Sequence, residues 1–279
     1  MKPPRPSAGF IPELVPSPSP APPKRITVGK FYIYQEPRIS AAKLAEYAVA
    51  SPARQKTLAQ NAKIAPTLLL APYREARDTL SHAHTHNGIN AGYLLRVADE
   101  IEKRVPEKDW QKAENPRCVT ALRRLAKVAD QVECEGGHLI HRPSSGWGGI
   151  KIAGVYVSIN PELVFSVDHR GVRKVGGVIL NTGQGPALSL DRSHDDHSVG
   201  DYLTTLLFCM LEMRLNITGI PLHTRCYAID IARERIHTAP ASHKRLLKNL
   251  EAACEIIAMR WDKIDVSAVT ERVGGEEEE

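Results

Sequence analysis

Glu162 has the residue type and the position best suited to chemistry in this chain. It follows Pro161 at the junction of two apolar segments, where a side chain can project from the edge of a sheet into a cleft. A carboxylate at such a place can hold Mg²⁺ or Mn²⁺, which prefer oxygen ligands and activate water for attack on a phosphodiester. Asn-Pro-Glu is also a common connection between strands, so a plain turn is the alternative.

Two histidine-rich segments could also carry chemistry. Ser193-His-Asp-Asp-His-Ser198 places His194 and His197 at a spacing that lets both lie on one face of a helix and bind a transition metal. The same residues suit a helix N-terminus, with a serine as the cap and acids in the first turn, and this interpretation is favoured. The alternating histidines of His82-Ala-His-Thr-His86 precede the turn signal Asn87-Gly88, which favours a solvated helix end.

The segments that must position Glu162 predict an α/β fold. Apolar runs predict strands at 154–159, 161–167 and 173–182, then a buried helix at 201–215 and a strand at 225–231. Helical spacing and proline placement predict further helices, at 53–62, 73–82, 91–104, 116–134 and 246–257. We therefore expect a helical N-terminal region followed by a mixed sheet flanked by helices.

The same reading divides the chain into four parts. Residues 1–27 are rich in proline and predict a disordered tail. Residues 28–112 form the helical N-terminal region, 113–264 the α/β core, and 265–279 an acidic tail. At the start of the N-terminal region, Val28–Tyr34 is expected to form a short strand or an extended docking segment.

The charge of the chain favours an anionic partner. The formal net charge is +5, although the last four residues are all glutamates, so the body is clearly basic. Basic surfaces attract polyanions, nucleic acid first among them. We expect Arg123, Arg124 and Lys127, on the helix at 116–134, to contact nucleic acid. Arg54 is also expected to contact nucleic acid. It belongs to a segment of two short helices that could form a helix-turn-helix. The alternative for all four is a solvated helix face.

The cysteines and the hydropathy of the chain predict its compartment. Five cysteines are scattered without a C-x-x-C pair, which favours buried free thiols in a reducing compartment. No apolar segment approaches the roughly 18 residues that a membrane-spanning helix needs. We therefore expect a cytoplasmic protein without a membrane partner.

The order of the expected elements resembles that of the PD-(D/E)xK nucleases, the superfamily of the restriction endonucleases. In that family the first acid follows a proline, as Glu162 follows Pro161 with Glu in place of Asp. The resemblance covers about residues 116–261 and implies a restriction-endonuclease-like αβββαβ core that binds Mg²⁺ or Mn²⁺. The Glu-x-Lys motif of the family is absent from 177–181. Lys174 would then stabilise developing charge, and Glu133 or Glu135 would supply a second carboxylate, as a metal ligand or a catalytic group.

The residues and the resemblance together lead to two functional hypotheses. The first is a nucleic-acid-binding protein, with DNA favoured over RNA, whose nuclease-like core cleaves phosphodiesters with a divalent metal. The alternative is a non-catalytic interaction protein that binds a protein partner on a degenerate nuclease scaffold, which would explain the missing motif. A hydrolase using His194 and His197 is a third possibility. Residues 155–165 and 227–240 also resemble uncharacterised bacterial proteins from mobile elements.

Overall fold

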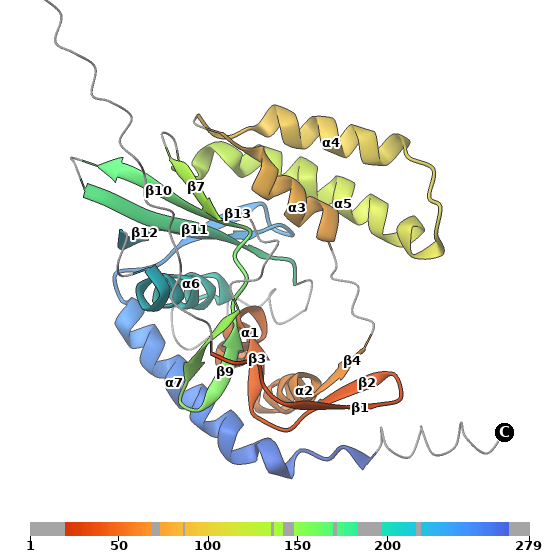
Figure 1. Cartoon of the computed structure of the whole chain (residues 1–279), viewed down its shortest axis with the longest axis vertical. Helices are drawn as coiled ribbons and strands as arrows, with labels where there is room; N and C mark the ends of the chain where they lie inside the picture. The colour runs from red at the N-terminus through yellow and green to blue at the C-terminus, as the bar shows by residue number, and fades with distance from the viewer. Residues whose placement is uncertain are drawn as a thin grey trace, which may run out of the picture.

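A five-stranded mixed sheet with the order β13-β12-β11-β10-β7 lies in the middle of the molecule (Figure 1). The computed structural model describes residues 20–67, 73–85, 87–134, 137–141, 148–169, 172–183, 197–215 and 219–267. The strands of this sheet are β7 (His138–His141), β10 (Leu163–His169), β11 (Val172–Asn181), β12 (Ile220–Asp230) and β13 (Arg235–Thr238). β10 is antiparallel to both of its neighbours, β7 and β11, whereas β12 is parallel to β11 and β13 is antiparallel to β12. The α/β class predicted from the sequence is confirmed.

Helices cover both faces of this sheet because its strands alternate two apolar sets of side chains. Leu163, Val178 and Tyr227 belong to one buried cluster, and their neighbours Val164 and Ile179 belong to the other. The first cluster is closed by α3 (Arg74–Ala83), α4 (Ala91–Lys103) and α5 (Asp109–Val128), and the second by α6 (Val199–Leu215).

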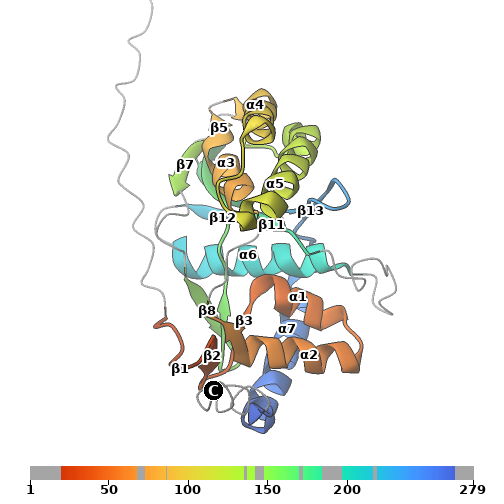
Figure 2. The same cartoon turned by 90° about the vertical axis from the view of Figure 1, so that its right-hand side faces the viewer.

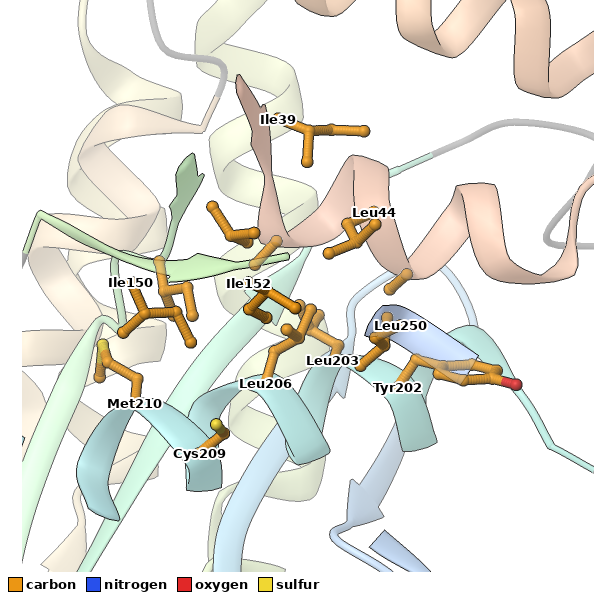
Figure 3. Packing of buried hydrophobic residues seen from close by; sticks show 14 of the residues in the cluster. Ile39, Leu44, Ile150, Ile152, Tyr202, Leu203, Leu206, Cys209, Met210 and Leu250 are labelled. Carbon is orange, nitrogen blue, oxygen red and sulfur yellow. The ribbon is translucent and has the colours of Figure 1, made fainter. Parts of the chain in front are cut away.

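The other side of α6 packs against a layer that combines N-terminal, central and C-terminal segments of the described chain. This layer contains β1 (Arg25–Val28), β2 (Phe31–Tyr34), β3 (Arg38–Ser40), α1 (Ala41–Val49), α2 (Pro52–Lys63), β4 (Ile64–Pro66), β8 (Gly149–Ile152), β9 (Val155–Ser158) and α7 (His243–Arg260). A short hairpin, β5 (His84–Thr85) and β6 (Gly88–Ile89), follows α3. Figure 2 shows α6 between the main sheet and the layer that contains α1, α2 and α7. Figure 3 shows Leu44 close to Leu203 and Leu250, in the same buried cluster as Ile39 and Ile150. The N-terminal helices therefore pack on two different layers, α1 and α2 with α6 and α7, and α3 to α5 on the main sheet.

The strand expected at 154–159 lies in a different sheet from the one predicted. β9 pairs with β8 and, in parallel, with β3, and these three strands form a sheet of their own. Ala153 and Gly154 both have positive φ and turn the chain sharply from β8 into β9. The hairpin that results extends from the main sheet to the layer below it, where α1 and α7 cover its apolar side chains.

The sequence predicted that a helix begins at Pro116, and this prediction is wrong. Pro116 lies inside α5. The helix begins earlier, at Asp109, where the Gln111 side chain accepts a hydrogen bond from the Lys108 N–H at 2.8 Å. Proline has no N–H, so the carbonyl of Lys112 loses its partner one turn later in the helix. Buried side chains on the α5 face that packs on α4 and the sheet, including Val119 and Leu122, stabilise the helix across this point.

All five cysteines are buried and none forms a disulfide, as the sequence predicted. Burial raises the pKa of Cys118 and of Cys209 to about 11 and that of Cys254 to about 12. Thiols with such pKa values hold almost no thiolate at neutral pH and are poor nucleophiles. No helix among the described residues is long and apolar enough to cross a bilayer.

Gly200 is required in the first turn of α6 because the imidazole of His237 lies directly over it. A Cβ added at Gly200 would lie 2.2 Å from the ring of His237. We expect Gly200→Ala to lower the free energy of unfolding by about 1–3 kcal/mol, measured by urea denaturation. Gly92→Ala is the matched control, because Gly92 occupies the same turn of α4 and its added Cβ would meet only the Asn90 side chain, at 3.3 Å. That variant should change the free energy of unfolding by no more than about 1 kcal/mol, and an equal loss in both would contradict the role of His237.

Candidate functional site

The Glu162 carboxylate is buried and held from two sides. Its side chain stands just before β10 and is 2% exposed. One oxygen forms an ion pair with the Arg77 guanidinium of α3, and the other accepts a hydrogen bond from the Leu180 N–H of β11 at 2.7 Å. Burial raises the pKa of Glu162, while Arg77 and the Leu180 N–H oppose that rise. The carboxylate therefore links α3 to the sheet and is not presented to solvent.

The structure does not bring the other predicted catalytic residues to Glu162. Lys174 is paired with Val167 in the β10–β11 hairpin, whereas Glu162 precedes the pair Leu163–Val178. Four residues of a strand separate these pairs, a distance of about 13 Å. Glu133 is exposed and forms an ion pair with Arg225 at 2.6 Å. Glu135 lies outside the described residues.

A metal centre is not assembled in the part of the chain that the structure describes. No group of three or more His, Cys, Asp or Glu side chains there is arranged to hold an ion. The predicted ligands Glu162 and Glu133 are instead each paired with an arginine. The two carboxylates also contact different strands, since Glu162 accepts a hydrogen bond from Leu180 of β11 and Glu133 pairs with Arg225 of β12.

The four predicted nucleic-acid contacts all form ion pairs with carboxylates. Arg123 contacts Glu102 at 2.7 Å on one side of α5. Arg124 and Lys127 share Glu234 on the other side, at 3.7 and 2.8 Å. Exposed pairs of this kind contribute little free energy and can exchange partners with a ligand. Arg54 of α2 pairs with Glu46 of α1 at 2.6 Å. Both helices lie in the layer on the far side of the sheet from α5 (Figure 2), so Arg54 is not part of the same surface as Arg123, Arg124 and Lys127.

A cavity of about 280 Å³ opens where the parallel strands β11 and β12 end beside α5. Ligands of open α/β sheets bind beyond the carboxyl ends of parallel strands. The cavity is lined by Tyr73, Pro116, Arg117, Thr120, Ala121, Arg124, Thr182, Ile231 and Ala232. Sequence reasoning missed this site, although Arg117 and Arg124 are seven residues apart and so lie on the same face of a helix.

Two guanidinium groups make this cavity suitable for an anion. Arg124 is anchored in place, because its Nη1 donates to the carbonyl oxygens of Ile231 at 3.4 Å and of Ala232 at 3.3 Å. Arg117 is exposed and has no ion pair within the described ranges. Hydroxyl groups of Thr120 and Thr182 add neutral donors. Guanidinium and hydroxyl donors in one concave site are typical of phosphate binding.

The described part of the 193–198 motif forms the N-terminus of α6. Ser198 directly precedes the helix, and its N–H and Oγ both donate to Asp201, at 2.8 and 3.0 Å. Ser198 Oγ also lies 3.2 Å from Nδ1 of His237, whose pKa is lowered by burial. Asp201 is 3.9 Å from the same nitrogen, so it holds the serine and not the imidazole, unlike a catalytic triad. His194 lies outside the described residues.

The second histidine-rich segment is divided between two elements. His82 is in the last turn of α3, where its Nδ1 contacts the Asp78 carbonyl oxygen at 2.6 Å. His84 follows in β5, and His86 lies outside the described residues. These histidines do not form a metal site within the described chain.

No family model matches this chain, and no curated protein matches it. Among the described residues, the cavity at the ends of β11 and β12, with Arg117 and Arg124 in its lining, is the place best suited to hold an anion.

Proposed function

We propose that this protein binds nucleic acid through the cavity containing Arg117 and Arg124, on a nuclease-like scaffold that does not cleave. The observation that carries the proposal is the pair of guanidinium groups at the carboxyl ends of β11 and β12. The basic composition of the whole chain supports a polyanionic ligand over a single small anion.

The order and direction of the elements support the nuclease-like part of the proposal. A helix (α5) is followed by three antiparallel strands (β7, β10 and β11), a crossover helix (α6) and a parallel strand (β12). This order is compatible with the αβββαβ core that the resemblance implies, if β7 takes the place of the strand expected at 154–159. The β8–β9 hairpin is then an insertion between the first two strands of the core.

The absence of cleavage follows from the environment of Glu162. A metal ligand needs a lone pair directed at an open position, and a divalent ion must approach the carboxylate. Both Glu162 oxygens already have partners, Arg77 and the Leu180 N–H, and the side chain is buried. Arg77 supplies the positive charge that a metal ion would otherwise bring to the carboxylate. Lys174 lies too far along the sheet to act on the same phosphodiester.

The balance of charge around the cavity favours phosphate. Arg117, Arg124 and Lys127 lie near one another on α5; Arg124 and Lys127 share the carboxylate of Glu234, and Arg117 has no ion pair among the described residues. The cluster therefore keeps net positive charge, and a phosphate can displace Glu234 without leaving Arg124 unpaired. Each neutralised phosphate of a nucleic acid releases counterions, so the affinity should depend strongly on salt concentration.

The proposal predicts that Arg117→Gln/Arg124→Gln weakens binding to DNA and RNA and reduces its salt dependence. The slope of log K against log salt should fall by about 1.5 to 2, the effect of losing two phosphate contacts. Fluorescence anisotropy with labelled duplexes and single strands measures both quantities. Arg96→Gln/Lys103→Gln is the control, because it removes the same two positive charges from exposed positions on α4. Unchanged binding in the double variant, or an equal loss in the control, would overturn the assignment.

The same samples with Mn²⁺ test the non-catalytic part. We expect intact substrate after incubation, and binding that does not respond to the metal. Cleavage that requires Mn²⁺ and disappears in Glu162→Gln would instead establish an active nuclease.

A further inference from the structure

A second cavity, of about 360 Å³, lies on the other side of the same helix. It opens between the end of α4 and the first half of α5. Pro116 and Thr120 line both cavities, so a ridge of two side chains separates this one from the Arg117–Arg124 cavity. Its lining consists of Ile101, Glu102, Arg104, Pro106, Lys112, Asn115, Pro116, Val119, Thr120 and Arg123.

Asn115 brings an unused hydrogen-bonding group to this cavity. Its side chain is 9% exposed, and in the described part of the chain its Nδ2 has no hydrogen-bond partner. A buried polar group without a partner costs about 1–3 kcal/mol, so native proteins seldom keep one without a ligand or water. The Lys112 carbonyl adds an acceptor, because Pro116 cannot donate to it. An amide donor and a carbonyl acceptor thus occur within one helical turn.

The remaining lining favours a flat, uncharged ligand. Two prolines, Pro106 and Pro116, provide apolar surface, and the buried side chains of Ile101 and Val119 lie beneath it. The charged side chains at the rim are already matched. Their ion pairs are Arg104 with Glu75 at 2.8 Å, Lys112 with Asp109 at 2.8 Å, and Arg123 with Glu102 at 2.7 Å. A second phosphate would find no unpaired cation here, in contrast to the neighbouring cavity.

We propose that this second cavity holds an unpaired base of a single-stranded nucleic acid whose phosphate lies in the Arg117–Arg124 cavity. The inference rests on the proposed function and specifies its ligand. A nucleobase combines apolar faces with donors and acceptors at its edge, and an asparagine amide pairs with such an edge. A base inside a duplex is stacked and paired, so only an unpaired one can enter. Thr120, on the ridge, faces both sites and lies where the sugar would pass.

The test compares a short mixed-sequence single strand with an abasic strand of the same length. Both carry the same number of phosphates, so their difference in affinity measures the base alone. We expect the strand with bases to bind about tenfold more tightly, the effect of one well-held base. Asn115→Leu should lower the affinity for the strand with bases to that for the abasic strand. The affinity for the abasic strand should not change. Leucine has a similar volume and no polar atoms, so this variant should fold with an unchanged or raised Tm.

The possible failures are distinguishable. Equal affinity for the two strands, or an Asn115→Leu loss that also affects the abasic strand, would overturn the base-binding cavity. The proposed function would survive that result if Arg117→Gln/Arg124→Gln still weakened both strands. No binding of either strand by the unmodified protein would overturn the proposed function itself.

Discussion

Arg77→Met is expected to lower the free energy of unfolding by about 3–5 kcal/mol at neutral pH, the usual cost of removing one partner from a buried ion pair. Methionine retains most of the apolar stem of arginine, so the loss should come from the charge. The guanidinium is the only cation on the Glu162 carboxylate among the described residues, and that carboxylate is buried under α3. Without Arg77, the chain must bury an unpaired negative charge or protonate it.

The pH dependence of this variant identifies the buried carboxylate as the cause. Because burial raises the pKa of Glu162, the folded protein holds the carboxyl proton more tightly than the unfolded chain does. Stability therefore falls as the pH rises from the ordinary pKa of glutamate to the raised value. Removing Arg77 raises this pKa further, so the destabilisation should be largest at neutral pH and smaller under acidic conditions. Urea denaturation across a pH series measures it.

The double variant Arg77→Met/Glu162→Gln is the control for this prediction. Glutamine has the shape of glutamate and can still accept the Leu180 N–H hydrogen bond, but it carries no charge. We expect the double variant to recover more than half of the stability lost by Arg77→Met and to lose the pH dependence. If the two variants are equally unstable at every pH, the ion pair is not the source of the loss.

Local sequence patterns were sufficient to predict most of the helices and the strands β9 to β12, whereas β7, β8 and β13 were missed. The helices expected at 91–104 and 201–215 correspond to α4 (Ala91–Lys103) and α6 (Val199–Leu215), because apolar spacing and caps are encoded within each segment. The partner of β9 was not predictable in this way. Its pairing with β3 joins Arg38 to Tyr156, and the alternation of apolar residues marks a strand without indicating which strand it will meet.

The candidate site shows the same division between local and distant information. The position of Pro161-Glu162 correctly indicated an unusual carboxylate, but its partner Arg77 lies 85 positions away on a helix with no recognisable motif. A proline before an acid could therefore predict a special environment and not its chemistry. The spacing of Arg117 and Arg124 was visible, whereas the cavity between them exists only because β11 and β12 end beside α5. The start of α5 was missed because its cap uses lysine and glutamine.

Trp261→Ala is expected to be comparably destabilising, by about 3–5 kcal/mol, because it removes a large side chain that is 1% exposed. Trp261 directly follows the last residue of α7 and connects this helix to β2 and α2. Its Nε1 donates to the Tyr34 carbonyl oxygen of β2 at 3.2 Å. Its own carbonyl oxygen accepts a hydrogen bond from the buried Lys63 Nζ of α2 at 2.7 Å. The substitution therefore tests whether residues 28–67 form part of the core or a separate unit.

Trp110→Ala is the matched control, because Trp110 is 45% exposed on α5 and its loss should change stability by no more than about 0.5 kcal/mol. Circular dichroism should follow both denaturations, since each variant removes a tryptophan fluorophore. If the layer below α6 shares one core with the sheet, Trp261→Ala will shift a single cooperative transition to lower urea concentration. A separate early transition, with the remainder of the protein as stable as before, would show that this layer folds independently. In that case binding to the Arg117–Arg124 cavity should persist after the first transition, because that cavity belongs to the main sheet and α5.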